Sequence, residues 1–349
     1  MPHSKAVRLG WAEARRGCRA GEMEDRLWAM EAILKGPRPA VLNDFAKGTP
    51  GGCLANPFTM RGVRLRFQLP FATVALPPLA LAGCIRAYLI KDTTGGKHPQ
   101  EAPRLNRYPA SVYCGVAWFL QGSSERIDAE GGAPQPLAST LLLGPQTRPW
   151  ATRNPGPVRT FGVVFQPHAF HQLTGLPISA LVDGLLPAQE VLPAPWRALC
   201  DAVRQAQDDA ARMALIEDTV ATHWRSRDGA QVADGAPGTR WLQELQAHAA
   251  ASGLGGSLRS LERHARTWAG QPVRRLAWLS RAESTLLQAR TDSERSGQVP
   301  RWQEVASGAG YADQSHLCRE TQRVTGHSPG ELARGVDTDD SYWFYRLWS

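Results

Sequence analysis

The chain has 349 residues, a formal net charge of +8 and an isoelectric point of about 9.5. This length is sufficient for two domains with separate cores, and the positive charge suits a polyanionic partner. The longest apolar run, residues 71–83, is interrupted by Pro77 and Pro78 and is too short to cross a bilayer. We find no cleavable export signal before it and therefore expect a cytoplasmic protein without a membrane segment.

The cysteines do not form a metal-binding or disulfide pattern. None belongs to a Cys-x-x-Cys pair, and none has a neighbouring histidine at the spacing of metal ligands. We therefore expect a reduced protein with neither a zinc site nor a disulfide framework. The six cysteines are at positions 18, 53, 84, 114, 200 and 318.

Residues 1–59 are mixed in composition, with one helical stretch at residues 22–34 between flanks rich in Gly, Pro and scattered charge. Two interpretations remain open for this segment. It is either an extension of the protein, or the chain starts at Met60 and the preceding residues come from a misassigned start codon.

Residues 60–230 are expected to form a β-rich domain. Short segments rich in β-branched and aromatic residues alternate with Gly, Pro, Asn and Ser, as in a β-barrel or sandwich. Helical periodicity follows at residues 169–173, 178–186 and 195–224, and residues 227–238 have the composition of a linker. The expected strands are residues 63–67, 84–90, 112–120, 139–143 and 158–165.

Catalytic motifs are missing from the sequence. There is no Gly-x-Ser-x-Gly motif and no phosphate-binding glycine loop. His168 and His171 are three residues apart, which would let them share a metal on a helix, but no third ligand stands at an obvious spacing. We prefer to interpret them as ordinary helix residues, and we expect no enzyme, no metal and no cofactor.

The region after residue 300 has the pattern of a helix-turn-helix. A short helix is expected to start at Trp302, and Gly310 can adopt the positive φ of a turn. Asp313 suits the N-cap of a second helix, accepting from the backbone N–H of the second or third residue after it. Leu317, with Thr321 and Val324 farther along, would face inward, and Gly326 and Pro329 would end the helix.

A second unit of this kind is expected upstream. Ser257 to Gly270 and Asp313 to Gly326 both span thirteen positions from cap to glycine, which fits an internal duplication. The stretch between them, residues 273–289, has one helical apolar stripe and would be about 25 Å long. That length can place two helices in successive major grooves about 34 Å apart. Taken alone, however, each half is also compatible with a helical hairpin in an ordinary core, and the DNA-binding interpretation depends on both halves, their spacing and the connecting helix together.

The stretch GYADQSHLCRETQRVTGHSP, together with the upstream unit, closely resembles the DNA-binding module of AraC/XylS-type transcription regulators. The segments RYPAS, WFL and FGVVFQP more loosely resemble the cupin-like sensing domain of a subgroup of these regulators. Ala265 and Thr321 depart from the large apolar residues usual in the family. The first unit also has room for only one helix, at residues 241–251. Two alternatives remain open: residues 213–227 supply its missing helix, or the unit is remodelled.

This resemblance implies an α+β protein: an N-terminal β-barrel or sandwich with a helical layer, then an all-α domain with two helix-turn-helix units over residues 239–336. It implies a DNA-binding transcription regulator that responds to a small effector, with RNA polymerase as a partner if it is an activator. Helices in 195–224 would form a homodimer surface, although a layer covering the barrel is an equal alternative. The residues implied to bind double-stranded DNA are Gln314, Ser315, His316, Arg319, Arg323, Arg259, Glu262 and Arg263.

Tyr113, Trp118 and Phe165 are candidate walls of an apolar effector cavity inside the barrel, and the same side chains suit a plain core. The aromatic tail, residues 337–349, is expected to dock on the protein or on a partner, because its aromatic side chains would form an exposed hydrophobic patch in water. The alternative function is a ligand-binding or enzymatic β-domain whose degenerate helix-turn-helix module acts as a protein-interaction adaptor.

Overall fold

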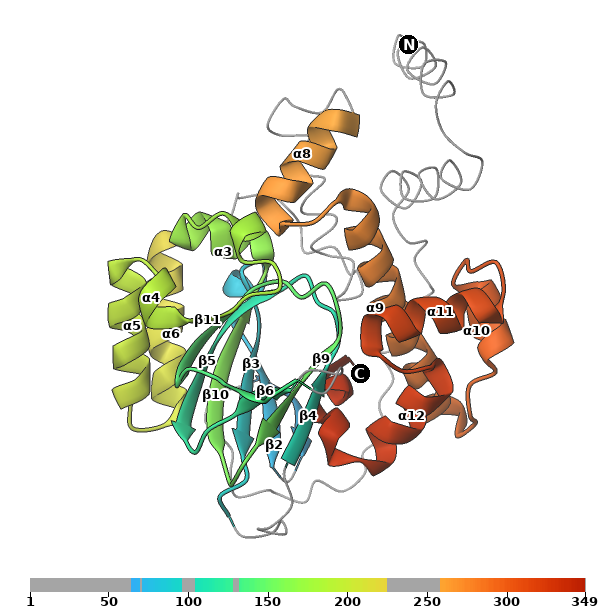
Figure 1. Cartoon of the computed structure of the whole chain (residues 1–349), viewed down its shortest axis with the longest axis horizontal. Coiled ribbons are helices and arrows are strands. Elements are labelled where there is room, and N and C mark those ends of the chain that lie inside the picture. Colours follow the sequence, from blue (N-terminus) through green and yellow to red (C-terminus); the bar gives the residue numbers. More distant parts are fainter. Residues whose placement is uncertain (1–63, 70, 96–103, 128–131, 225–257, 349) are drawn as a thin grey trace.

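The computed structural model of the protein describes residues 64–69, 71–95, 104–127, 132–224 and 258–348. A β-rich N-terminal part and a helical C-terminal part are evident (Figure 1), which confirms the α+β class. The expected extension over 1–59, the linker over 227–238 and the candidate helix over 241–251 lie outside the described residues.

The β-domain consists of two antiparallel sheets. The larger has seven strands in the order β1-β2-β3-β10-β5-β8-β11, and the smaller has four in the order β4-β9-β6-β7. The strands are β1 (Arg64–Leu69), β2 (Ala72–Leu76), β3 (Ile85–Asp92), β4 (Arg104–Tyr108), β5 (Cys114–Gln121), β6 (Glu125–Ile127), β7 (Gln135–Pro136), β8 (Thr140–Leu143), β9 (Trp150–Asn154), β10 (Arg159–Phe165) and β11 (Leu185–Pro187).

All five predicted strands are present, as β1, β3, β5, β8 and β10. The smaller sheet was not predicted, because its strands are short and largely polar and therefore lack the apolar alternation on which the prediction relied. The pairing of β4 with β9 joins segments that are far apart in the sequence, so local patterns could not indicate it.

A helical layer covers one face of the larger sheet (Figure 1). It contains α3 (Pro167–Thr174), α4 (Ala188–Val191), α5 (Ala194–Gln205) and α6 (Asp209–His223). In α6, Met213, Ile216 and Val220 are buried in the core of the β-domain. The suggestion that residues 213–227 supply a helix to the first DNA-binding unit is therefore wrong for residues 213–223, which belong to α6 and pack on the β-domain. A dimer surface on the outer side of this layer stays a prediction.

Two of the predicted helices differ from the structure. Residues 178–186 form a 3-10 turn, Ile178–Ala180, and then β11, because Asp183 takes a left-handed conformation (φ 59°) that reverses the chain. Residues 195–224 form two helices rather than one. Asp208 caps α6 by accepting a hydrogen bond from the backbone N–H of Ala211, so a new helix begins there.

The C-terminal part is helical throughout. The long helix α9 is continuous to Ser296, seven residues past the predicted end, and its 24 residues make it about 36 Å long. A left-handed glycine, Gly297 (φ 65°), ends it. The helices are α8 (Leu258–Ala269), α9 (Val273–Ser296), α10 (Trp302–Gly308), α11 (Gln314–Thr325), α12 (Pro329–Thr338) and the 3-10 segment η3 (Asp340–Trp348).

The two parts are joined by close contacts. The backbone N–H of Ala110, in the loop after β4, donates to the carbonyl of Val324 in the last turn of α11 at 2.7 Å. The Arg275 guanidinium on α9 donates to the carbonyl of Thr147. Helix α8 packs against α3 and the turn at Ile178–Ala180. The helical part is therefore held against the β-domain at several points.

Candidate nucleic-acid interface and interdomain pocket

Helices α10 and α11 form the predicted helix-turn-helix. Gly310 has a φ of 75°, so it makes the turn in the conformation that glycine adopts without strain. The Asp313 carboxylate caps α11 by accepting from the His316 backbone N–H at 2.6 Å. Gly326 ends α11 with a φ of 80°, and Pro329 opens α12. The sequence prediction of this unit is confirmed in its caps, its turn and its stop.

The faces of α11 also agree with the prediction. Leu317, Thr321 and Val324 are buried, at 0%, 1% and 1% exposure. The opposite side is polar and positively charged, and no described residue covers it. Its exposed side chains are Gln314, Ser315, Arg319, Gln322 and Arg323.

A buried ion pair holds α11 against α9. Arg281 on α9 donates through one terminal nitrogen to both carboxylate oxygens of Glu320, each at 2.7 Å, and it stacks on the ring of Tyr311 at 4.4 Å. Burial, followed by the charge of Glu320, raises the pKa of Tyr311 to about 12. The orientation of α11 is thus fixed by charge pairing as well as by its apolar face.

DNA contact was predicted for His316, but in the structure its side chain does not project freely from α11. Its Nε2 lies 3.1 Å from the Glu320 carboxylate, and its ring meets Tyr311 edge-on at 5.4 Å. The side chain is 30% exposed. The i, i+4 spacing of His316 and Glu320 on one helix turns the imidazole toward the domain interior. His316 therefore belongs to the support of α11 more than to its exposed face.

The first unit agrees with the prediction only in part. Gly270 ends α8 in the left-handed conformation (φ 70°), as expected. Arg263 is exposed, but Glu262 accepts from the backbone N–H of Val273 at 3.1 Å and also contacts Arg266 at 3.3 Å. Glu262 therefore caps α9, a role that its predicted outward position did not suggest. The side chain of Arg259 lies outside the described residues.

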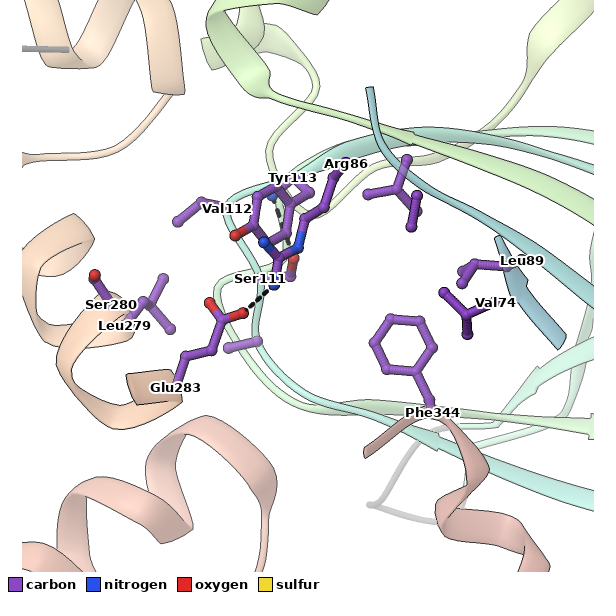
Figure 2. A pocket seen from close by; sticks show the side chains of 13 residues that line it. Val74, Arg86, Leu89, Ser111, Val112, Tyr113, Leu279, Ser280, Glu283 and Phe344 are labelled. Carbon is purple, nitrogen blue, oxygen red and sulfur yellow. Dashed lines mark hydrogen bonds and ion pairs between the residues drawn. The ribbon is translucent and has the colours of Figure 1, made fainter. Parts of the chain in front are cut away.

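A pocket lies between the β-domain and α9 (Figure 2). Val74, Leu89 and Val164 line it from the larger sheet, and Leu279 lines it from α9. Phe344 of the C-terminal segment reaches it from below in Figure 2, close to Val74 and Leu89. The walls of the pocket are thus largely apolar and come from the larger sheet, the loop before β5, α9 and the C-terminal segment.

One charged pair lies at this pocket. The Arg86 guanidinium donates to Glu283 of α9 at 2.5 Å, with side-chain exposures of 14% and 9%, and stacks on the Tyr113 ring at 4.5 Å. Ile85 and Ala87 on β3 pair with consecutive residues of β10, so the register shift leaves Arg86 as the extra residue of a β-bulge. A bulge re-aims side chains, and as a result both Arg86 and Ala87 line the pocket. This ion pair was not predicted, because a β-bulge has no recognisable pattern in the local sequence.

Of the three predicted effector residues, only Tyr113 lines the pocket. Trp118 and Phe165 point to the other face of the sheet, where they are 2% and 0% exposed in the core beneath the helical layer. The Trp118 indole N–H donates to the Cys200 carbonyl of α5. Both therefore occupy the plain core that was the alternative for them. Strand alternation explains this placement, since adjacent residues face opposite sides and the barrel interior takes Val164 rather than Phe165.

His168 and His171 have separate surroundings in the structure. His168 is buried beside Trp224, and His171 Nδ1 lies 2.7 Å from the Leu176 carbonyl after the end of α3. Within the described residues, no cluster of three or more His, Cys, Asp or Glu side chains is arranged to hold a metal ion. No described helix combines the length and apolarity needed to span a membrane.

His327, which follows the C-cap Gly326 of α11, should make the stability of the protein depend on pH. Burial and the charge of Arg107 lower its pKa, against an opposing effect of Glu331, and Tyr342 Oη lies 3.3 Å from its ring. The unfolded chain then takes up the proton more readily, so stability present above about pH 6.5 is lost as the pH falls through the folded-state pKa. Urea unfolding at pH 7.5 and 5.5 should show a larger loss for the wild type than for His327→Gln. Equal losses would contradict this assignment.

Comparisons with known proteins add the following. A family model described as a domain of unknown function, DUF6597, matches residues 73–187, from β2 to β11. No curated protein matches the chain. Among solved structures, ToxT from Vibrio cholerae is 11% identical at a TM-score of 0.30, covering 66% of this chain and 95% of that one. An apo variant of ToxT is 11% identical at a TM-score of 0.34 (70% and 96% covered), and ToxT bound to an unsaturated fatty acid is 11% identical at 0.29 (67% and 96%).

Proposed function

We propose that this protein is a sequence-specific DNA-binding regulator of transcription of the AraC/XylS type. The observation that carries the proposal is α11: it is capped and stopped as a recognition helix, and its exposed face consists of polar and basic residues. An α-helix of this kind fits the major groove, where side chains of its N-terminal half meet base edges. We place its action in the cytoplasm, with RNA polymerase as a further partner if it activates.

In this proposal Gln314, Ser315 and Arg319 face bases, and Arg323 faces bases or phosphate. Ser315 and Arg319 are one helical turn apart, so they share a face with Gln322. Arginine can bind guanine through two hydrogen bonds, which makes Arg319 the main candidate for base recognition. His316 supports this face from behind through Glu320.

The first unit would contribute mainly contacts to the DNA backbone. Arg263 and Arg266 are exposed on α8, whereas Glu262 is engaged within the protein. The two recognition helices are separated by α9, whose length of about 36 Å compares with a groove repeat of about 34 Å. A single chain of this design can contact two successive grooves.

We also propose that the interdomain pocket receives a small effector. Its walls join strands of the β-domain to α9, the helix that carries the second DNA-binding unit. A ligand there would contact both parts at once, so its binding could alter how they are held together. Tyr113 and Arg86 would supply the polar contacts in an otherwise apolar site.

Arg319→Ala tests the DNA-binding proposal. We expect the affinity for a preferred site, found by selection from random duplexes, to fall by roughly 5-fold to 150-fold, the equivalent of about 1 to 3 kcal/mol. Affinity for a random duplex of equal length should fall much less. Fluorescence anisotropy at several salt concentrations measures both.

Arg197→Ala is the matched control, because Arg197 is exposed on α5, remote from α11, and its loss changes the net charge equally. It should leave both affinities nearly unchanged. An equal loss on both duplexes for Arg319→Ala would make Arg319 a phosphate contact. A wild-type protein with no salt-dependent retention on any DNA would contradict the proposed function itself.

A further inference from the structure

The C-terminal segment η3 lies between the β-domain and the helix-turn-helix. It packs along β4, the edge strand of the smaller sheet, and against α12 (Figure 1). Trp343 is 4% exposed and clusters with Phe71 and Ala72 of the β-domain. This confirms the expectation that the aromatic tail docks, and it identifies the site where it docks.

That site makes specific contacts with the indole ring. The Trp343 indole N–H donates to Asn106 Oδ1 at 3.0 Å. The Lys91 ammonium lies 5.2 Å from the centre of the Trp343 ring, and the Tyr108 ring meets it edge-on at 6.4 Å. The indole is therefore held by a hydrogen bond, a cation–π contact and an aromatic edge.

The β-domain itself holds the acceptor in place. The Asn106 amide donates to Thr152 Oγ1 at 3.0 Å and to Asn154 Oδ1 at 3.3 Å, both on β9. Lys91 of β3 donates to the same Asn106 oxygen that accepts from the indole. Because these partners all come from the strands, the acceptor is oriented without help from the tail.

The occupant of this site is held less securely than the site. Trp343 lies on the 3-10 segment η3, and such helices have poorer hydrogen bonding than α-helices. Elements with weaker hydrogen bonding open locally at a lower free-energy cost than core strands. Trp343 can therefore leave while the strands that form its site stay folded.

We propose that this site of the β-domain binds a planar aromatic compound with one N–H donor, and that the chain's own Trp343 is its resident occupant. A free compound of this class competes with the tail for Asn106, Lys91 and Tyr108. This proposal does not depend on DNA binding.

Displacement of the tail would reach the end of α11. The Tyr345 hydroxyl donates to the carbonyl of Thr325, the last residue of α11, at 3.1 Å. Tyr342 contacts His327, and Arg107 of β4 donates to Ser341 at 3.3 Å and stacks on Tyr342. Each of these contacts is made by η3, so release of Trp343 loosens the C-terminal end of the candidate recognition helix.

The first experiment uses the full chain labelled with 5-fluorotryptophan, with indole as the probe. Trp343→Phe assigns the fluorine signal of Trp343 among those of the other tryptophans. We expect added indole to move this signal toward its position in unfolded protein. Indene, which has the same shape but lacks the N–H, should move it only at roughly fivefold higher concentration, because one hydrogen bond contributes about 1 kcal/mol. Amide hydrogen exchange at residues 324–328 should rise in parallel.

The second experiment measures binding to the vacated site. Trp343→Ala should bind indole in calorimetry with the same preference over indene, and adding Asn106→Leu should remove that preference. The proposal is overturned if the wild-type Trp343 signal stays fixed at indole concentrations that saturate Trp343→Ala. If Trp343→Ala does not fold, an unmoved wild-type signal up to the solubility limit of indole overturns it equally.

Discussion

Glu320→Gln is expected to lower the free energy of unfolding by about 3 to 5 kcal/mol, which is typical when one partner of a buried ion pair is removed. Arg281 and Glu320 are only 12% and 10% exposed, and both carboxylate oxygens accept from the guanidinium. Glutamine keeps the size of the side chain but leaves the arginine charge buried without its carboxylate partner. Urea unfolding followed by circular dichroism measures the change.

Glu294→Gln on α9 is the matched control. It removes the same carboxylate from an i, i+4 pair with Arg290 in which Glu294 is 60% exposed, so we expect a loss of only about 0.3 to 0.5 kcal/mol. The double variant Arg281→Met with Glu320→Leu should recover most of the stability lost in Glu320→Gln, because no buried charge then remains. Similar losses for Glu320→Gln and Glu294→Gln would show that the pair is not a main support of α11.

The Glu283→Gln variant should have an effect of similar size, again about 3 kcal/mol or more, at the contact between the β-domain and α9. Its partner, Arg86, comes from the bulge in β3 and stays buried against Tyr113 when the carboxylate is lost. Hydrogen exchange should rise at α9 and in the loop holding Ser111 and Val112, because these segments meet at the pocket. Thermal unfolding gives the overall loss.

The control for Glu283→Gln is Glu125→Gln, which affects a pair with Arg153 inside the smaller sheet at exposures of 24% and 39%. A loss below about 1 kcal/mol is expected there. If Glu283→Gln unfolds the chain completely, the double variant Arg86→Met with Glu283→Leu is measured instead. It removes both charges together, so it should be more stable than Glu283→Gln. Unchanged exchange at α9 in Glu283→Gln would exclude the pair as an interdomain tie.

The helix-turn-helix could be predicted in detail because its signals are local. Asp313, Gly310 and Gly326 each act on backbone groups within a few residues, and each has the role expected of it. The same holds for the apolar stripe of α9, although the helix is continuous past Ala289 until Gly297 stops it. Propensity and capping determine such features, and both can be seen in a short window of sequence.

The pocket could not be predicted, because its residues come together only through distant pairing. Arg86 and Glu283 are 197 positions apart, and the bulge that turns Arg86 toward α9 depends on the register of β3 with β10. Trp118 and Phe165 were chosen for their aromatic character, yet strand alternation buries both beneath the helical layer. Tyr113 does line the pocket, because it lies in the loop before β5, where the chain turns toward α9; its contact with an effector stays a prediction.

The hydrogen bond from the Ala110 backbone N–H to the Val324 carbonyl has an evolutionary consequence. Both of its atoms belong to the main chain, so almost any replacement of either side chain leaves the bond chemically available; only proline at position 110 would delete the donor. A sequence in which Arg86 and Glu283 are both replaced can therefore still hold the β-domain against the last turn of α11. In a lineage that diverges rapidly, we expect this attachment to outlast the ion pairs around it.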